Sequence, residues 1–181
     1  WAGTVGGSFE TDVCRANHTS GAWVMAGDSM FVRVLDFGRI KGDMTTCTGH
    51  DKLMLSESLA RTIFGDSDPI GQIVLYENAT PRTVVGIFRD PPSNTHLGNF
   101  NALIPFDALA GSFYMGWDGG DSFPTYLKLR AGHTPSDVEA LLPASFERHG
   151  LTKSIEQFGS HYLPQPITRP AQTGTTLVQT P

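Results

Sequence analysis

The sequence lacks several features that would place it in a common functional class. No apolar run approaches the roughly 20 residues that span a bilayer, and the longest stretches, such as Thr83–Phe88, are strand-sized. Charged residues make up only 17% of the 181 residues. The 13 basic residues are scattered rather than gathered in a stripe, which argues against nucleic acid as a partner. The chain begins at Trp1 without a Met or a signal-like region, so we expect a mature protein or an excised domain.

Cysteine is also scarce. Cys14 and Cys47 are the two cysteines, and their separation is too large for a close metal or redox pair. In an oxidising compartment they could form one disulfide that closes a loop of about 30 residues and stabilises the fold by roughly 3 kcal/mol. The alternative is two independent, partly buried thiols.

A calcium-binding loop is suggested by the acidic stretch that begins at Asp66. As a twelve-residue loop it would have Asp68 third, Gly71 sixth and Glu77 twelfth. The fifth position, however, is Ile70, which has no side-chain ligand. We therefore interpret the stretch as a turn with solvated acids and with Ile70 packed into the core, and we predict no metal-binding residues.

Catalytic motifs are missing as well. Ser56 follows a strand and opens a helix, as a nucleophile does, but it lacks the flanking glycines of that motif and is better explained as a helix N-cap. The histidines show no metal-ligand spacing. They are His18, His50, His96, His133, His149 and His161. We predict no catalytic and no cofactor-binding residue, and hence no enzyme and no cofactor.

What the sequence does contain is one strongly patterned segment, Leu53–Asp90. Lys52–Leu55 is predicted to be a strand, and Ser56 caps a predicted helix over Glu57–Phe64 that stops at Gly65. The hairpin that follows is expected from strands at 72–76 and 82–89, ended by consecutive prolines. Every residue type in the segment suits folding rather than chemistry.

The flanks carry weaker signals. Residues 1–20 are polar and glycine-rich, with weak strand character at best. Asp28 or Ser29 is expected to cap a helical turn over 30–35, and short strands are expected at 101–104 and from Tyr126 to Arg130. Thr134 should cap a helix that Pro143 kinks or loosens. The element order predicts an α+β fold.

The patterned segment resembles the MacB-like periplasmic core domain, the extracytoplasmic part of permease subunits in MacB/FtsX-type ABC transporters. The matching positions run from the capped helix through the Pro-Ile-Gly turn to the second hairpin strand. They are Ser56, Glu57, Ala60, Phe64, Gly65, Pro69, Ile70, Gly71, Val85, Gly86 and Ile87. The run 89–96 is similar to a Bacteroidetes-type branch, and weaker likeness extends over residues 22–168.

The resemblance implies a porter-like α/β subdomain with an inserted, smaller β-rich subdomain. We expect a periplasmic core domain over residues 1–168. Its porter-like part would cover about 1–49 and 122–168, and the β-rich insertion about 50–121. Residues 169–181 are expected to be a flexible tail toward a removed transmembrane helix.

The same resemblance implies a mechanotransmission role at the periplasmic face of the bacterial inner membrane. The domain would couple cytoplasmic ATP hydrolysis to movement or release of a substrate, without catalysing a reaction itself. The implied partners are an ATP-binding subunit or domain, a second permease (a homodimer or a pair) and an outer periplasmic protein, but no nucleic acid.

A second hypothesis is a free-standing secreted or periplasmic ligand-binding domain. Its ligand would enter an apolar pocket in the aromatic-rich 113–123 loop, lined by Phe113, Tyr114, Trp117 and Phe123. The alternative is that these side chains simply pack under a loop. Hydrophobic helices encoded on either side of this domain would favour the permease, and a signal peptide followed by a stop codon would favour the binding protein.

Overall fold

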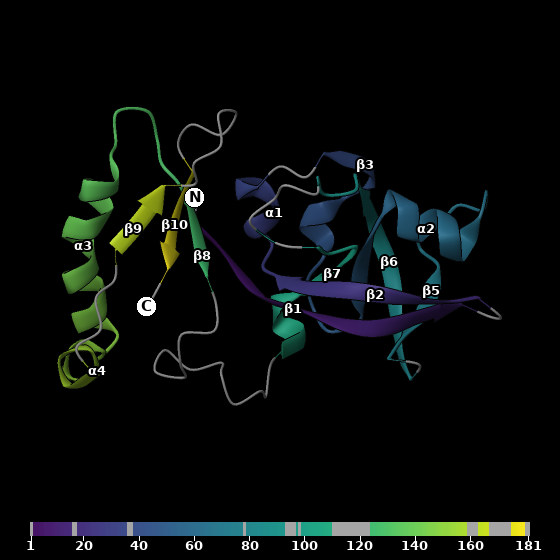
Figure 1. The fold of residues 1–181 in the computed structure, drawn as a ribbon, viewed down its shortest axis with the longest axis horizontal. Helices are drawn as coiled ribbons and strands as arrows, with labels where there is room; N and C mark the ends of the chain where they lie inside the picture. The colour runs from purple at the N-terminus through teal and green to yellow at the C-terminus, as the bar shows by residue number, and fades with distance from the viewer. Residues whose placement is uncertain are drawn as a thin grey trace.

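In a computed structural model the chain forms two lobes joined by one long strand (Figure 1). The structure describes residues 2–15, 18–35, 38–77, 79–92, 97, 99–109, 124–158, 163–166 and 175–179. The joining strand is β1 (Ala2–Arg15), and it pairs with different strands at its two ends. None of the helices in the described ranges is long and apolar enough to cross a membrane.

The larger lobe is a closed six-stranded barrel. Its strands follow the order β1, β2 (His18–Gly27), β7 (Ala102–Pro105), β4 (Lys52–Ser56), β6 (Thr80–Phe88) and β5 (Ile73–Tyr76). The circle closes because β1 pairs with β2 on one side and with β5 on the other, where Val13 lies opposite Tyr76. The pairs β2–β7 and β4–β6 are parallel, and the other pairs are antiparallel.

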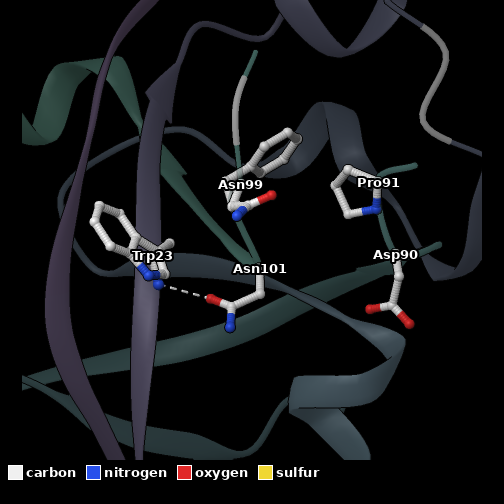
Figure 2. Close-up of a pocket in the computed structure, with 6 residues that line it drawn as sticks. Trp23, Asp90, Pro91, Asn99 and Asn101 are labelled. Carbon is white, nitrogen blue, oxygen red and sulfur yellow. Dashed lines mark hydrogen bonds between the residues drawn. The ribbon is translucent and has the colours of Figure 1, made fainter. Parts of the chain in front are cut away.

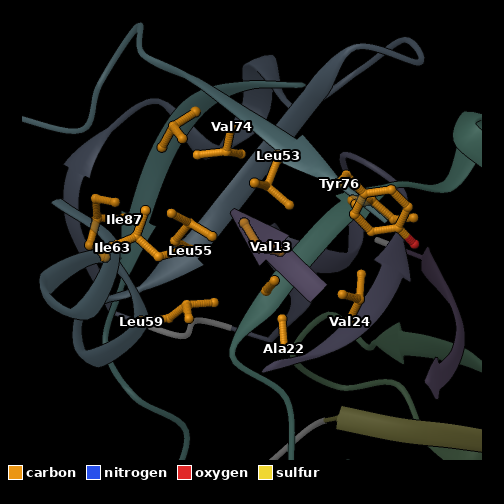
Figure 3. Packing of buried hydrophobic residues seen from close by; sticks show 14 of the residues in the cluster. Val13, Ala22, Val24, Leu53, Leu55, Leu59, Ile63, Val74, Tyr76 and Ile87 are labelled. Carbon is orange, nitrogen blue, oxygen red and sulfur yellow. The ribbon is translucent and has the colours of Figure 1, made fainter. Parts of the chain in front are cut away.

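The barrel interior is an apolar core (Figure 3). Inward and outward residues alternate along the barrel strands, as a strand's two-residue period requires. The exception is β6, where a register shift opposite Leu53 and Met54 places Val84 and Ile87 in the same core. Helix α2 (Glu57–Phe64) lies against this core through Leu59, Ile63 and Phe64. The inward side chains of the strands include Val13, Ala22, Val24, Leu53, Leu55, Val74, Tyr76, Val84, Ile87, Ala102 and Ile104.

A second apolar cluster lies on the outside of the barrel. Met25 and Met54 alternate with the inward residues of β2 and β4, so both faces of these strands are buried. The short helix α1 (Phe31–Val34) covers this cluster, with Phe31 fully buried. Asp28, one of the two predicted caps, satisfies N–H groups at the start of α1, because its Oδ1 accepts hydrogen bonds from the backbone N–H groups of Met30 and Phe31. Met30 occupies the position just before the helix and makes no side-chain cap bond.

Strand β3 (Arg39–Gly42) extends the barrel wall beside the second half of β6. Its last residue, Gly42, lies opposite Gly86 in this antiparallel pair. Short 3-10 helices follow β3 and β7, at Met44–Thr46 (η1) and Phe106–Leu109 (η2).

The smaller lobe is a sheet covered by a helix. Its strand order is β1, β8 (Thr125–Lys128), β10 (Thr175–Gln179) and β9 (Leu163–Pro166). Helix α3 (Pro135–Arg148) packs against β9 and is followed by α4 (Thr152–Phe158). As predicted, α3 begins after Thr134 and contains Pro143. The capping box that Thr134 forms with Asp137 was not predicted.

The α+β prediction is confirmed, and so are the predicted α2 and the β5–β6 hairpin. The prediction for residues 1–20 was wrong, because β1 and β2 form the longest ladder among the residues that the structure describes. Glycine-rich, polar sequence has a low intrinsic strand propensity. These residues form strands because they pair with neighbouring strands.

Two predicted boundaries also need correction. The predicted boundary at residue 49 assigned β2 and β3 to the porter-like part. In the structure β2 pairs with β7 and β3 pairs with β6, so both strands belong to the barrel with residues 50–105. The tail at 169–181 was predicted to be flexible, yet β10 lies within it and pairs with β8 and β9. The assignment of the smaller lobe as porter-like stays a prediction.

Candidate functional site

The segment after β6 is fastened to the start of α2 by Asp90. Its carboxylate accepts hydrogen bonds from the Ser58 backbone N–H at 3.2 Å and from Ser58 Oγ at 2.5 Å. Ser56 is fully buried, and its Oγ accepts from the Leu59 N–H at 3.4 Å, which confirms the predicted N-cap. Ser56 therefore acts as a helix cap.

Burial alone would raise the pKa of Asp90, but other contacts outweigh it. Hydrogen bonds from Ser58 and Ser56 and the nearby Arg61 charge hold this pKa below its usual value. A carboxylate at a helix N-terminus is also stabilised by the helix dipole. Asp90 thus stays ionised and holds the chain against α2.

Asp90→Asn should lower the free energy of unfolding at pH 7, because it removes the charged acceptor for the Ser58 hydrogen bonds. The loss should be only about 1 kcal/mol, because the carboxylate is exposed and its charge is partly screened by solvent. A lowered pKa in the folded state stabilises the fold above the unfolded pKa, and this contribution is lost as pH falls through the folded value. The wild-type advantage should therefore begin to shrink below about pH 4, the ordinary pKa of Asp, and vanish only at lower pH, once Asp90 is protonated in the folded state as well. Urea unfolding of the wild type and of Asp90→Asn at pH values from 7 to 3 measures this difference in stability. Asp66→Asn is the control, because Asp66 is exposed and has no described hydrogen bond; an equal effect there would contradict the prediction.

A small hollow lies beside this junction (Figure 2). It has a volume of about 170 Å³ and is lined by Trp23, Asp90, Pro91, Asn99, Phe100 and Asn101. Asn101 extends the β2–β7 pairing, since its Oδ1 accepts from the Trp23 N–H at 2.8 Å and its own N–H donates to the Trp23 carbonyl at 2.9 Å. The lining residues offer apolar contact and hydrogen bonds, but no nucleophile paired with a base.

The acidic stretch from Asp66 forms a turn held by other contacts. Asp68 accepts from the Ile70 N–H at 3.1 Å and forms an ion pair with Lys41 at 2.7 Å. Ile70 packs against the barrel core, as predicted. Within the described parts of the chain, no group of three or more His, Cys, Asp and Glu side chains could hold a metal ion, and His96 and His161 lie outside those parts.

Both cysteines are free thiols in different surroundings, so the disulfide considered on sequence is not formed in this structure. Cys14 is half-buried on β1, whereas Cys47 is buried in the outer apolar cluster. Burial raises the pKa of the Cys47 thiol to about 12. Cys47 is therefore an inert, packed thiol.

A thiol reagent should modify only Cys14 in the folded protein at pH 8, because thiolate, the reactive form, is scarce and inaccessible at Cys47. The second thiol should react only after unfolding in denaturant. Counting the thiols that react with and without denaturant checks this. Cys14→Ser should abolish the fast reaction, and two fast thiols in the native protein would contradict the prediction.

Sequence reasoning missed the buried Arg82. It is 6% exposed, its Nη1 donates to the His50 carbonyl at 2.8 Å, and its guanidinium lies 4.5 Å from the centre of the Tyr76 ring. Its Nε is buried without a hydrogen-bond partner. The pKa of Tyr76 is raised, mainly by burial and also by Glu77. Arg82 lies two residues before the inward Val84 and therefore on the same face of β6, so the two-residue period of the strand was a signal that could have found it.

The aromatic residues proposed as an alternative ligand site lie outside the described residues. They are Phe113, Tyr114, Trp117 and Phe123.

Comparison with known families decides how this arrangement is classified. Residues 2–145 match the family described as the MacB-like periplasmic core domain. The chain belongs to this family. The predicted membership among periplasmic domains of ABC transporter permeases is thereby confirmed, and this is not a catalytic family. None of the curated proteins compared with the sequence matches it.

Solved structures of transporter and permease domains share the fold at low sequence identity. A domain assigned to a permease protein of Porphyromonas gingivalis is 19% identical, with a TM-score of 0.75 over 98% of this chain and 71% of that one. The extracellular domain of the noncanonic ABC-type transporter YknZ from Gram-positive bacteria is 17% identical, with a TM-score of 0.57 over 82% and 75%. The periplasmic region of MacB from Actinobacillus actinomycetemcomitans is 18% identical, with a TM-score of 0.58 over 86% and 74%.

The family motif of the MacB-like domain has structural roles in this chain. Gly65 has a φ of +58° and ends α2, where its N–H donates to the Arg61 carbonyl. Gly71, with a φ of +78°, donates its N–H to the Val84 carbonyl at 2.8 Å and so joins the turn after Pro69 to β6. The motif thus builds one wall of the barrel and its α2 end.

Proposed function

We propose that this chain is the extracytoplasmic domain of an ABC transporter permease subunit. It couples ATP hydrolysis in the cytoplasm to movement or release of a substrate on the periplasmic side, and it is itself non-catalytic. The observation that carries the proposal is the family match over residues 2–145, together with the fold shared with transporter domains.

The link between the lobes supports a mechanical role. β1 is a member of both sheets, because Ala2–Thr4 pair with β8 and Ser8–Arg15 pair with β2. Beside this strand, Phe31 of the barrel lobe lies against Tyr126 of the smaller lobe, with ring centres 5.7 Å apart. A shared strand and a packed aromatic contact allow displacement of one lobe to move the other.

The smaller lobe is the side on which transmembrane helices would attach. The first and last described strands, β1 and β10, both flank β8 in its sheet. With this lobe near the periplasmic face of the inner membrane, the barrel would lie farther out. The partners in this arrangement are an ATP-binding subunit or domain, a second permease subunit and an outer periplasmic protein.

Distance measurements between spin labels test the coupling. Ile73 is 59% exposed on the barrel, so Ile73→Cys in a Cys14→Ser background accepts one label per chain while Cys47 stays protected. In the complete transporter, with both permease copies labelled, ATP should shift the label-to-label distance. An ATP-binding subunit unable to bind nucleotide should abolish the shift. Identical distances with and without ATP would overturn the proposal.

A further inference from the structure

The outward face of α3 carries a short stripe of exposed residues at helical spacing. Asp137, Leu141, Ala144 and Arg148 follow one another at intervals of four, three and four residues, which places them along one side of the helix. All four are exposed, and at 69% Leu141 is the most exposed large hydrophobic side chain that the structure describes.

The opposite side of α3 faces its own lobe. Val138, Leu142 and Phe146 are half-buried there, and the helix packs against β9 (Figure 1). The stripe therefore does not pack against the parts of the lobe that the structure describes. An exposed leucine forms a ridge on the helix surface, and a small residue beside it leaves a groove. A second helix can pack closely against such a surface by fitting its own ridge into the groove.

The charges at the ends of the stripe are opposite. Asp137 lies in the first turn and Arg148 in the last, about 16 Å apart at 1.5 Å per residue. Asp137 Oδ2 accepts from Thr134 and lies 3.7 Å from His133 Nδ1, whereas no bond to its Oδ1 is described. Arg148 has no ion pair with any described residue.

The stripe on one α3 helix is complementary to the same stripe on a second α3 helix that runs in the opposite direction. If two such helices run antiparallel about a two-fold axis between Leu142 and Pro143, Asp137 of each copy faces Arg148 of the other. Leu141 of each then lies over Ala144 of the other. The interface places a large side chain against a small one and a negative charge against a positive one.

We infer that α3 is a self-association surface, on which a second copy of this chain packs its own α3 antiparallel. Spacings of four and three residues fit a shallow crossing of about 20°. One helix pair buries less than the roughly 1,200 Å² of a stable interface, so the isolated chains should associate weakly and in a concentration-dependent manner. Tethering two copies in one assembly would strengthen the contact. The inference is independent of the transporter proposal, because either can fail while the other holds.

Sedimentation equilibrium of the chain over a range of concentrations is the first test. We expect a monomer–dimer equilibrium that Leu141→Ser and Arg148→Asp each weaken at least tenfold. Asp137→Arg combined with Arg148→Asp should restore association, with circular dichroism confirming that α3 stays folded. Ile73→Ser is the matched control, since Ile73 is also an exposed aliphatic residue but lies on the barrel. A chain that stays monomeric at millimolar concentration, or one that Ile73→Ser affects as much as Leu141→Ser, overturns the inference.

Cross-linking tests the register without disturbing the helix cap. In a Cys14→Ser background, Leu141→Cys and Ala144→Cys chains are mixed with a short bifunctional maleimide. The mixture should cross-link several-fold faster than either variant alone, because each cysteine faces the other's position. Equal rates in all three samples would rule out the antiparallel register.

Discussion

Gly42→Ala should lower the free energy of unfolding by about 3–5 kcal/mol, the largest effect expected for so small a change. A Cβ at this position would lie 2.2 Å from the Val85 carbonyl oxygen and 2.9 Å from Gly86 Cα. Both contacts are to backbone, which cannot rotate away. The φ of +77° adds the strain of a left-handed conformation. β3 would therefore have to separate from β6.

The matched control for this change is Gly71→Ala. Gly71 has nearly the same φ, +78°, but a Cβ there would meet nothing within 4 Å. Only the conformational strain remains, so we expect a loss of about 1–2 kcal/mol. Urea unfolding followed by circular dichroism compares the two variants. Equal losses would mean that β3 and β6 do not approach as closely as the structure shows.

Phe31→Ala should be the second most damaging change, at about 3–5 kcal/mol. The side chain is fully buried in the outer cluster, and its removal leaves a cavity where α1, the barrel and the smaller lobe meet. Thermal and urea unfolding measure the loss. Arg33→Ala, on the exposed side of the same helix, should change stability by less than about 0.5 kcal/mol.

A double-mutant cycle between Phe31→Leu and Tyr126→Leu isolates the contact across the lobes. The two rings are 5.7 Å apart and tilted by 52°, a geometry worth about 0.5–1.5 kcal/mol beyond burial. A coupling energy of zero would show that the rings do not help to hold the lobes together, and it would weaken the mechanical part of the proposed function.

Elements with local signals were predictable from the sequence. Ser56, Gly65 and Pro69 act through residues a few positions away, so their roles can be derived without knowing the fold. The same holds for the α3 capping box at Thr134. In each case the hydrogen-bond partners lie within about four residues.

The candidate site was predictable only in part. The N-cap at Ser56 was expected, but the hollow was not, because it joins Trp23 of β2 to Asp90 and Asn101 from distant parts of the chain. Likewise the link between Asp90 and Ser58 spans 32 residues. No pattern within a short window reports such a pairing.

The sequence by itself determined the capped helix, the hairpin, the α+β class and the family, because these depend on residue type and short-range spacing. The tertiary structure alone decided that β1 closes the barrel and also enters the second sheet, that β2 and β3 belong to the barrel, and that Gly42 meets Gly86. The physical reason is that strand pairing satisfies backbone hydrogen bonds between segments far apart in the chain, and backbone groups are nearly the same in every residue. A glycine-rich strand such as β1 therefore takes its place from its neighbours rather than from its own side chains.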